Sequence, residues 1–155
     1  MQFKTFCDSK TTLAQICLPH QTNSSGNIHG GEMMKMMDSA AGVAAMKYSG
    51  TNVVTARVDE LCFKHSVHIG ELVTCCANVV YAGKSSMETF VTVEAENPLD
   101  GTRKIALTAF FTMVALDENG VPHPVPSMKE PKDYFEKKLY EEGMKRYLKY
   151  KKRKK

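Results

Sequence analysis

A long apolar segment between residues 32 and 47 most constrains what this chain can fold into. Glu32–Lys47 repeats apolar residues every three or four positions, and these positions cover most of the circumference of a helix. Such a helix must be buried. A Gly-rich loop at residues 23–31 precedes it, and Gly50 marks its end. The shared apolar face comprises Met33, Met36, Met37, Ala40, Ala41 and Ala44.

Asp38 is the one acid in the interior of this segment. At 100° per residue it falls at the edge of the apolar face. A carboxylate is costly to bury unless it is paired or hydrogen-bonded, so its place on this helix needs a reason. The pattern alone leaves a structural and a catalytic reason open.

The segments around this helix alternate with a period of two and predict strands. One strand at Thr11–Leu18 precedes the helix and ends at Pro19. Four more are predicted at Val53–Phe63, Leu72–Tyr81, Met87–Ala95 and Arg103–Leu116. Because the connections are short, we expect these four to form an antiparallel meander, with a turn at His65–Gly70 between the first two.

These elements predict an α+β hotdog fold, in which an antiparallel sheet of about five strands wraps around one long helix. The length of 155 residues fits one domain. We expect that domain to span residues 1–127 and a charged C-terminal helix or tail to span residues 128–155. Helical spacing is loose over residues 133–149, and the Lys/Arg run at 151–155 is expected to be disordered.

Charge is divided unevenly along the chain. Residues 129–155 carry a net charge of +7, whereas residues 1–128 carry −3. A basic terminal segment suggests a polyanion partner, but the body lacks a basic surface with interleaved aromatic residues, so we expect no nucleic-acid binding. The sequence contains no run of 18 apolar residues, so membrane insertion is not expected, and residues 1–7 lack a secretory signal. A cytoplasmic location is therefore expected.

The cysteines and histidines do not indicate a metal or a disulfide framework. The five cysteines are odd in number and form no C-x-x-C pair, so we expect buried, reduced thiols. His65 and His68 are three residues apart, but no further ligands cluster with them. No metal site is therefore expected. We also expect no cofactor.

An ordered series of motifs resembles the acyl-CoA hydrolases of the hotdog superfamily, which include bacterial broad-range acyl-CoA thioesterases and the repeated domains of cytosolic mammalian acyl-CoA hydrolase. The resemblance covers about residues 11–126. Its specificity lies in the combined spacing, since a Gly-Gly pair before a helix is common. The motifs are Asn23-x-x-Gly26, Ile28-His29-Gly30-Gly31, Met37-Asp38, Val53-Val54-Thr55-x-Arg57-Val58-Asp59, Phe63, Gly70 and Gly83-Lys84-Ser85-Ser86-Met87.

The resemblance implies a site shared between two subunits. Asn23 of one chain would face Asp38 of the other in a homodimer, and three such dimers would assemble into a hexamer. It also implies that Ser85 and Ser86 lie near the pantetheine and phosphates of CoA. Arg57 and Lys84 are further candidates for the phosphates, although a charge on a strand or turn is usually just solvated.

The chemistry expected of an acyl-CoA substrate gives each candidate a role. Thioester hydrolysis needs a positioned water, a base for its proton and donors for the developing oxyanion. Asp38 would be the base, with a pKa raised if the helix buries it, or a nucleophile through an anhydride. Asn23 would polarise the carbonyl or hold the water. The backbone N–H groups of Gly30 and Gly31, at the start of the helix, would form the oxyanion hole.

Structural roles compete with several of these assignments. Asn23 also suits a turn, and Ser85 and Ser86 also suit the start of a hairpin strand. His29 occupies a place where the family often has an aromatic residue, so we expect it to pack rather than act as a base.

Two other functions share the expected fold. A non-catalytic sensor of acyl-CoA or a nucleotide needs no base, so the retained Asn23 and Asp38 favour the enzyme. A dehydratase or hydratase needs a catalytic His in a His-Phe or His-x-Pro setting, which is absent around His29. The basic tail is hypothesised to hold CoA phosphates or to touch an anionic surface.

Overall fold

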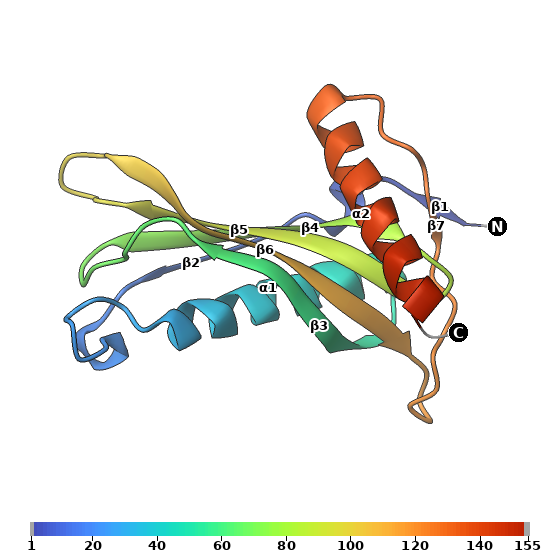
Figure 1. The fold of residues 1–155 in the computed structure, drawn as a ribbon, viewed down its shortest axis with the longest axis horizontal. Coiled ribbons are helices and arrows are strands. Elements are labelled where there is room, and N and C mark those ends of the chain that lie inside the picture. The colour runs from blue at the N-terminus through green and yellow to red at the C-terminus, as the bar shows by residue number, and fades with distance from the viewer. Residues whose placement is uncertain (1, 154–155) are drawn as a thin grey trace.

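The computed structural model describes residues 2–153, in which two helices lie on opposite faces of one sheet (Figure 1). Helix α1 (Gly30–Ser49) packs against one face, and helix α2 (Tyr134–Arg153) lies across the other. The strands are β1 (Phe3–Lys4), β2 (Thr11–Ile16), β3 (Asn52–Phe63), β4 (Leu72–Ala82), β5 (Ser86–Glu96), β6 (Arg103–Leu116) and β7 (Ser127–Met128). Short 3₁₀ helices lie at η1 (Phe6–Ser9) and η2 (Pro19–Gln21).

Helix α1 is the central helix that the apolar pattern predicts. Gly50 ends it in the left-handed conformation, with φ 73°, and donates its N–H to the Met46 carbonyl at 2.8 Å. All six residues of the predicted apolar face are buried: Met33, Met36, Met37, Ala40, Ala41 and Ala44. They pack against the inward-facing side chains of the sheet, so the hotdog fold is confirmed.

The strand order is β2-β4-β5-β6-β3, so the predicted four-strand meander is wrong for β3. The strands β4, β5 and β6 do form a meander, but β3 pairs with β6 at the far edge of the sheet. The 20-residue helix α1 carries the chain from β2, at one edge, to β3, at the other. Residues 64–71 are therefore a crossover rather than a hairpin turn, since alternation along a strand does not specify its neighbour.

Two irregularities in β3 set which face its side chains use. Thr55 pairs with Met113, and after a bulge Arg57 pairs with Thr112. Met113 is part of the core against α1, whereas Thr112 faces the α2 side. Residues two apart in a regular strand share a face, but the bulge places Thr55 and Arg57 on opposite faces. A second register shift lies between Asp59 and Cys62, where Glu60 has a positive φ of 49°.

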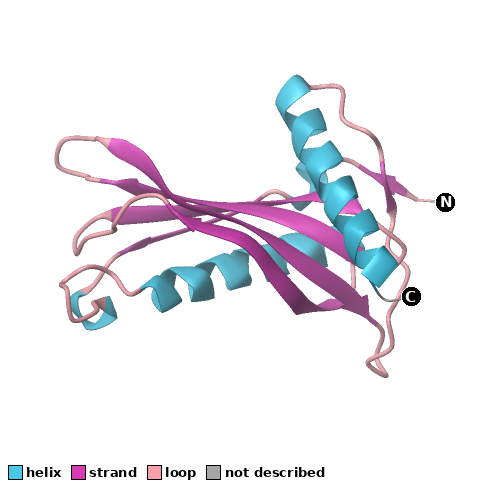
Figure 2. Ribbon diagram, in the orientation of Figure 1, coloured by secondary structure: helices cyan, strands magenta, loops and turns pink. Residues whose placement is uncertain are grey.

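The C-terminal region is more ordered than expected and packs on the sheet (Figure 2). Helix α2 continues to Arg153, so the prediction of disorder is wrong for residues 151–153, and residues 154–155 lie outside the described part. Gly143 permits the close approach of α2, because a Cβ there would lie 2.8 Å from the Tyr81 Cβ. Strand β7 pairs with β1 in parallel.

The five cysteines are all free, as expected, but they are not all buried. Cys17 and Cys75 lie in the core, whereas Cys7 and Cys62 are exposed and Cys76 is intermediate. Strand β3 is an edge strand, so no strand of this chain pairs with its outer edge, and this explains why Cys62 is exposed. Within residues 2–153, no helix combines the length and apolar character needed to cross a membrane.

Candidate active site

Asp38 and Thr55 meet at the open edge of the sheet. Thr55 donates a hydrogen bond from Oγ1 to Asp38 Oδ1 at 2.5 Å, which joins α1 to β3. No hydrogen bond to the other carboxylate oxygen occurs within residues 2–153. Asp38 is exposed in the single chain, so the burial expected from its place on the helix is not provided by this chain alone.

Asn23 shapes the loop that leads into α1. Its Oδ1 accepts hydrogen bonds from the backbone N–H groups of Ser25 at 3.0 Å and Asn27 at 3.2 Å. This is the turn role that the sequence left open. The carboxamide nitrogen makes no hydrogen bond to any residue in the described part of the chain, so it remains available as a donor to a ligand.

The N-terminus of α1 begins at Gly30 and is capped by His29. His29 Nδ1 accepts the N–H of Gly31 at 2.9 Å, and the His29 side chain is exposed. The expectation that His29 packs is therefore wrong, because its ring satisfies a free helix donor instead. The Gly31 N–H is engaged by this cap, and among residues 2–153 no acceptor is bonded to the Gly30 N–H.

A cavity of about 390 Å³ lies beside this helix start. Asn23 and Gly30 line its polar side, and Met33, Phe63 and Leu107 line its apolar side. Gly30 lies close to β3, and a Cβ there would lie 2.9 Å from the edge of the Phe63 ring, which would have to shift. The structure thus brings Asn23 and Gly30 together, while Asp38 does not line this cavity.

Of the remaining candidates, Arg57 and Ser86 lie on the opposite face of the sheet. Arg57 and Ser86 line a second cavity, of about 350 Å³, beneath α2. Lys84 and Ser85 lie in the adjacent β4–β5 turn, where their carbonyls accept the N–H groups of Val125 and Ala115, both at 2.9 Å. The structure therefore brings Arg57 and Ser86 together on the face opposite Asp38, with Lys84 and Ser85 in the turn next to Ser86.

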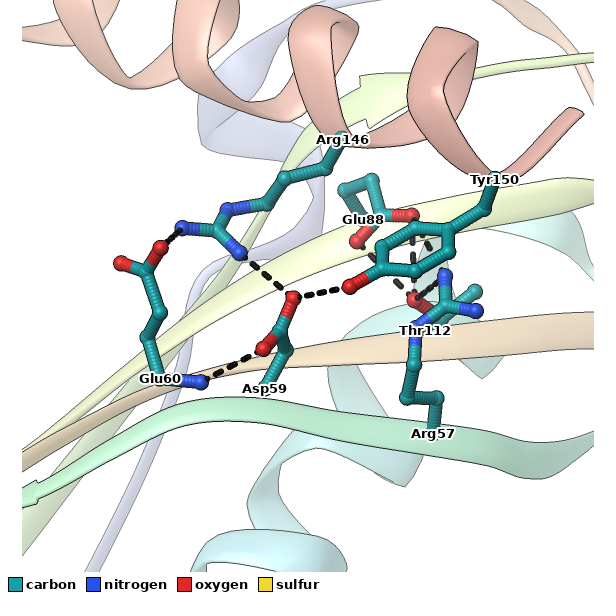
Figure 3. Close-up of polar contacts among 7 residues, drawn as sticks. All are labelled: Arg57, Asp59, Glu60, Glu88, Thr112, Arg146 and Tyr150. Atoms are coloured by element: carbon teal, nitrogen blue, oxygen red, sulfur yellow. Dashed lines mark hydrogen bonds and ion pairs between the residues drawn. The ribbon is translucent and has the colours of Figure 1, made fainter. Parts of the chain in front are cut away.

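A charged network connects α2 to β3 on this outer face (Figure 3). Arg146 is 7% exposed and contacts Asp59 at 2.9 Å and Glu60 at 2.6 Å. Tyr150 donates its hydroxyl to Asp59 Oδ2 at 2.6 Å, and this hydrogen bond lowers the pKa of the Asp59 carboxyl. The Tyr150 ring covers the guanidinium of Arg57.

Glu88 lies at the floor of the same cavity and is 2% exposed. Both of its carboxylate oxygens accept from Thr112 Oγ1, at 3.0 and 3.1 Å. Burial raises the pKa of Glu88 to about 7, and the hydrogen bond from Thr112 and the charge of Arg57 partly oppose that rise.

Sequence reasoning missed several of the residues that build these sites, among them Glu88 and Thr112. Thr55 stood within a recognised motif, but its place on a strand gave no sign that it would reach the helix. Arg146 and Tyr150 fell within the expected charged C-terminal helix or tail, and nothing local predicts their contacts with β3. Within residues 2–153, no group of three or more His, Cys, Asp or Glu side chains gathers in a way that could hold a metal ion.

Comparison with known proteins identifies the family. A model of the thioesterase superfamily matches residues 25–102, a range that includes Asp38, Thr55, Arg57 and Ser86. The chain belongs to the thioesterase superfamily.

Named members of the superfamily are similar over most of this chain. Mouse cytosolic acyl coenzyme A thioester hydrolase is 38% identical over 145 residues, which are 92% of this chain and 38% of the mouse protein. The chain thus spans less than half the length of that relative. The acyl-CoA thioester hydrolase YciA of Salmonella typhimurium is 36% identical over 118 residues, which cover 74% of this chain and 88% of YciA.

Solved thioesterase structures share the whole fold. An apo-hexameric acyl-CoA thioesterase matches with a TM-score of 0.92 and 38% identity, covering 99% of this chain and 97% of that one. The acyl-CoA hydrolase of Staphylococcus aureus, in complex with butyryl-CoA, CoA and CoA disulfide, matches with a TM-score of 0.89 and 33% identity, covering 98% and 92%. Variants of the staphylococcal enzyme in which an asparagine, a threonine or an aspartate is replaced by alanine have also been solved.

Proposed function

We propose that this protein hydrolyses acyl-CoA thioesters to a free carboxylic acid and CoA. The observation that carries the proposal is the Asp38 carboxylate held by Thr55 at the open β3 edge, since a positioned base is what thioester hydrolysis requires. The names of the similar proteins, which are acyl-CoA thioester hydrolases, support the same activity. A non-catalytic sensor would have no use for a carboxylate held in this way.

The active site is shared between two copies of the chain. Eight residues of helix separate Gly30 from Asp38, which corresponds to about 12 Å of rise, so Asn23 does not reach Asp38 of its own chain. Strand β3 is an edge strand with exposed Val54 and Val58, and such an edge offers unpaired backbone groups to a second strand. Pairing of two β3 strands would cover Asp38 and bring it to Asn23 of the other copy.

A trimer of such dimers is the assembly that we propose. Hexameric acyl-CoA thioesterases are among the structures that match this fold over nearly the whole chain, which supports six copies. The open β3 edge supports the dimer as the unit from which the hexamer is built.

Asp38 acts as the general base in the mechanism that the geometry favours. Thr55 occupies Oδ1 and fixes the carboxylate, which leaves Oδ2 to accept a proton from water. The water oxygen adds to the thioester carbonyl carbon, the C–S bond then breaks, and the CoA thiolate takes up the proton. Direct attack by Asp38, with an acyl anhydride as intermediate, is the variant mechanism.

Asn23 and the start of α1 stabilise the oxyanion. The free carboxamide N–H of Asn23 and the Gly30 N–H line one cavity and donate to the carbonyl oxygen as it gains charge. The Gly31 N–H contributes only if His29 leaves its capping position. The apolar wall formed by Met33, Phe63 and Leu107 suits the start of an acyl chain.

The CoA moiety is assigned to the group around the β4–β5 turn. Arg57 and Lys84 supply positive charge, and Ser85 and Ser86 supply hydroxyl groups, which suits the phosphates of CoA. No cofactor has a role in this mechanism, because CoA is part of the substrate.

The experiment that tests this proposal measures CoA release with a thiol reagent across acyl-CoAs from acetyl to palmitoyl. Wild type should turn over at least one of them, and Asp38→Ala and Asn23→Ala should each lower kcat by about 10² or more. Acyl-CoA binding without turnover of any substrate would instead identify a sensor.

A further inference from the structure

The second bulge of β3 decides which face of the sheet the end of this strand uses. Between Asp59 and Cys62, two residues of β3 lie opposite a single residue of β6. Asp59 is bonded to α2, whereas Phe63 pairs with Leu107, a core residue on the α1 side. Asp59 and Phe63 are four positions apart and would share one face of a regular strand. The bulge therefore directs Phe63 toward helix α1.

Phe63 is a wall of the cavity at the start of α1. It lines that cavity together with Asn23, Gly30 and Met33. A Cβ on Gly30 would lie 2.9 Å from the edge of the Phe63 ring, so the ring limits the space beside the Gly30 N–H. Because the ring is 56% exposed in the single chain, its own packing holds it only in part. The shape of the cavity therefore depends on the backbone that carries Phe63.

The bulge contains an unfavourable backbone conformation. Glu60 has a φ of 49°, and within residues 2–153 it is the only residue other than glycine with a positive φ. A side chain in the left-handed region crowds the backbone, which lowers the population of that conformation by about tenfold. Such a conformation persists where the surrounding structure holds it. The contacts of Glu60 therefore decide whether the bulge keeps its shape.

Arg146 of α2 holds the bulge at two points (Figure 3). Its Nη2 contacts Glu60 Oε1 at 2.6 Å, and its Nη1 donates to Asp59 Oδ2 at 2.9 Å. Asp59 Oδ1 in turn accepts the backbone N–H of Glu60 at 3.0 Å, and Tyr150 donates to Asp59 Oδ2 at 2.6 Å. Arg146 is 7% exposed, and its guanidinium lies 3.9 Å from the centre of the Phe110 ring. A fixed cation thus holds both the side chain and, through Asp59, the backbone of the bulge.

We propose that Arg146 is a positioning residue for the acyl end of the active site, which acts through the Glu60 bulge on the place of Phe63. This inference rests on the proposed hydrolase function. It gives α2, on the outer face of the sheet, a part in shaping the cavity on the inner face. Arg146 itself touches neither the cavity nor the substrate.

Substitution of Arg146 tests the inference with two substrates of the same acyl chain. Arg146→Met removes both ion pairs, and kcat of the folded variant for an acyl-CoA should fall by about tenfold, the factor expected when a left-handed residue is no longer held. The acyl N-acetylcysteamine thioester, which lacks the nucleotide, should lose the same factor, because the defect lies at the acyl end. Lys145→Met, which removes an exposed cation paired with Glu142, is the matched control and should keep the wild-type kcat.

A second substitution separates positioning from stability. Glycine adopts a positive φ without the steric cost of a Cβ. Arg146→Met/Glu60→Gly should therefore return kcat to within about threefold of wild type, with Glu60→Gly completing the double-mutant cycle. If Arg146 only stabilised the fold, folded Arg146→Met would keep the wild-type kcat. Arg146→Lys keeps the charge but not the fork that reaches two carboxylates, so it should lose about threefold and serves as the milder variant.

Hydrogen exchange, measured by mass spectrometry, reports on the bulge without turnover. Arg146→Met should speed exchange by about tenfold in peptides that span residues 59–67, and the added glycine should reverse this. Peptides from β4 should exchange as in wild type.

The outcomes separate this inference from the hydrolase proposal. If wild type hydrolyses acyl-CoA but Arg146→Met and Arg146→Lys keep its kcat, or if the glycine does not repair their loss, the inference is overturned. A loss confined to acyl-CoA also overturns it, because Arg146 would then act at the nucleotide end. If exchange changes as described but wild type hydrolyses no acyl-CoA, the hold of Arg146 on the bulge stands and the hydrolase proposal fails.

Discussion

Thr55 Oγ1 lies 2.5 Å from Asp38 Oδ1, and this single hydrogen bond joins the central helix to the open edge strand of the sheet. The contact depends on the β3 bulge after Thr55, which leaves Thr55 on the α1 side while Arg57 turns to the other face. The other carboxylate oxygen accepts no hydrogen bond from residues 2–153 and so can accept one from water. We therefore regard Thr55 as the residue that orients Asp38, the proposed general base.

Replacing Thr55 by valine removes the hydroxyl and keeps the β-branched shape. We expect kcat for acyl-CoA to fall by about 10-fold to 100-fold, because the carboxylate loses its orienting donor, with little change in KM. Thr55→Ser should retain most of the activity.

A matched control for this prediction is Thr12→Val. Thr12 is an exposed threonine on β2, at the opposite edge of the sheet, and its loss should leave kcat unchanged. Wild-type turnover in Thr55→Val would show that Asp38 needs no such positioning.

Replacing Glu88 by glutamine tests the buried carboxyl. Because the pKa of Glu88 rises from 4.5 to about 7 on folding, the folded state binds its proton more tightly than the unfolded state does. The stability that Glu88 contributes is thus complete below pH 4.5 and is lost as the pH rises through about 7. We expect Glu88→Gln to be more stable than wild type at pH 8, by on the order of 2 kcal/mol.

The measurement is urea unfolding of both proteins between pH 4.5 and pH 8.5. The stability difference should nearly vanish at the acidic end, where Glu88 is protonated in the folded state and about half protonated in the unfolded state. Glu94→Gln, on the same strand but at a partly exposed position paired with Arg103, should show no such trend. A difference that does not depend on pH would mean that Glu88 does not titrate in this range.

Two glycine-to-alanine substitutions separate the effect of helix propensity on stability from the effect of close packing between α2 and the sheet. Gly42→Ala should stabilise the protein by about 0.5–1 kcal/mol, because a Cβ there meets nothing within 4 Å and alanine favours the helix. Gly143→Ala should destabilise it, because the added Cβ would lie 2.8 Å from Tyr81 and 3.0 Å from Val80. Thermal unfolding of both variants measures the two signs, and a stabilised Gly143→Ala would show that α2 shifts freely on the sheet.

Only features that depend on residues near one another in the chain could be predicted from this sequence. The bounds of α1 and of the five strands of the sheet are encoded in apolar periodicity and turn residues, so they were predicted to within a few residues. The pairing of β3 with β6 was not predicted. Alternation with a period of two indicates which face of the sheet a side chain is on, but it does not indicate which strand is adjacent. The capping role of His29 and the contacts of Arg146 depend on three-dimensional partners in the same way.

The site residues show the same division. Asp38 stood out because an acid on an apolar helix needs an explanation, and Asn23 through its place in a family motif. Thr55 did not, because a threonine on a strand is ordinary and its partner lies 17 residues earlier in the chain. Tyr150 lies 93 positions beyond Arg57, so nothing in the local sequence links the two.

The measurement that tests the shared active site most directly mixes two inactive variants. Asp38→Ala and Asn23→Ala would be unfolded together, refolded as a mixture and assayed for CoA release from an acyl-CoA. If each site takes Asp38 from one chain and Asn23 from the other, half of the dimers are mixed and each contains one intact site, so about a quarter of the wild-type activity should return. If both residues act from the same chain, the mixture would stay as inactive as its parts, which would contradict the account.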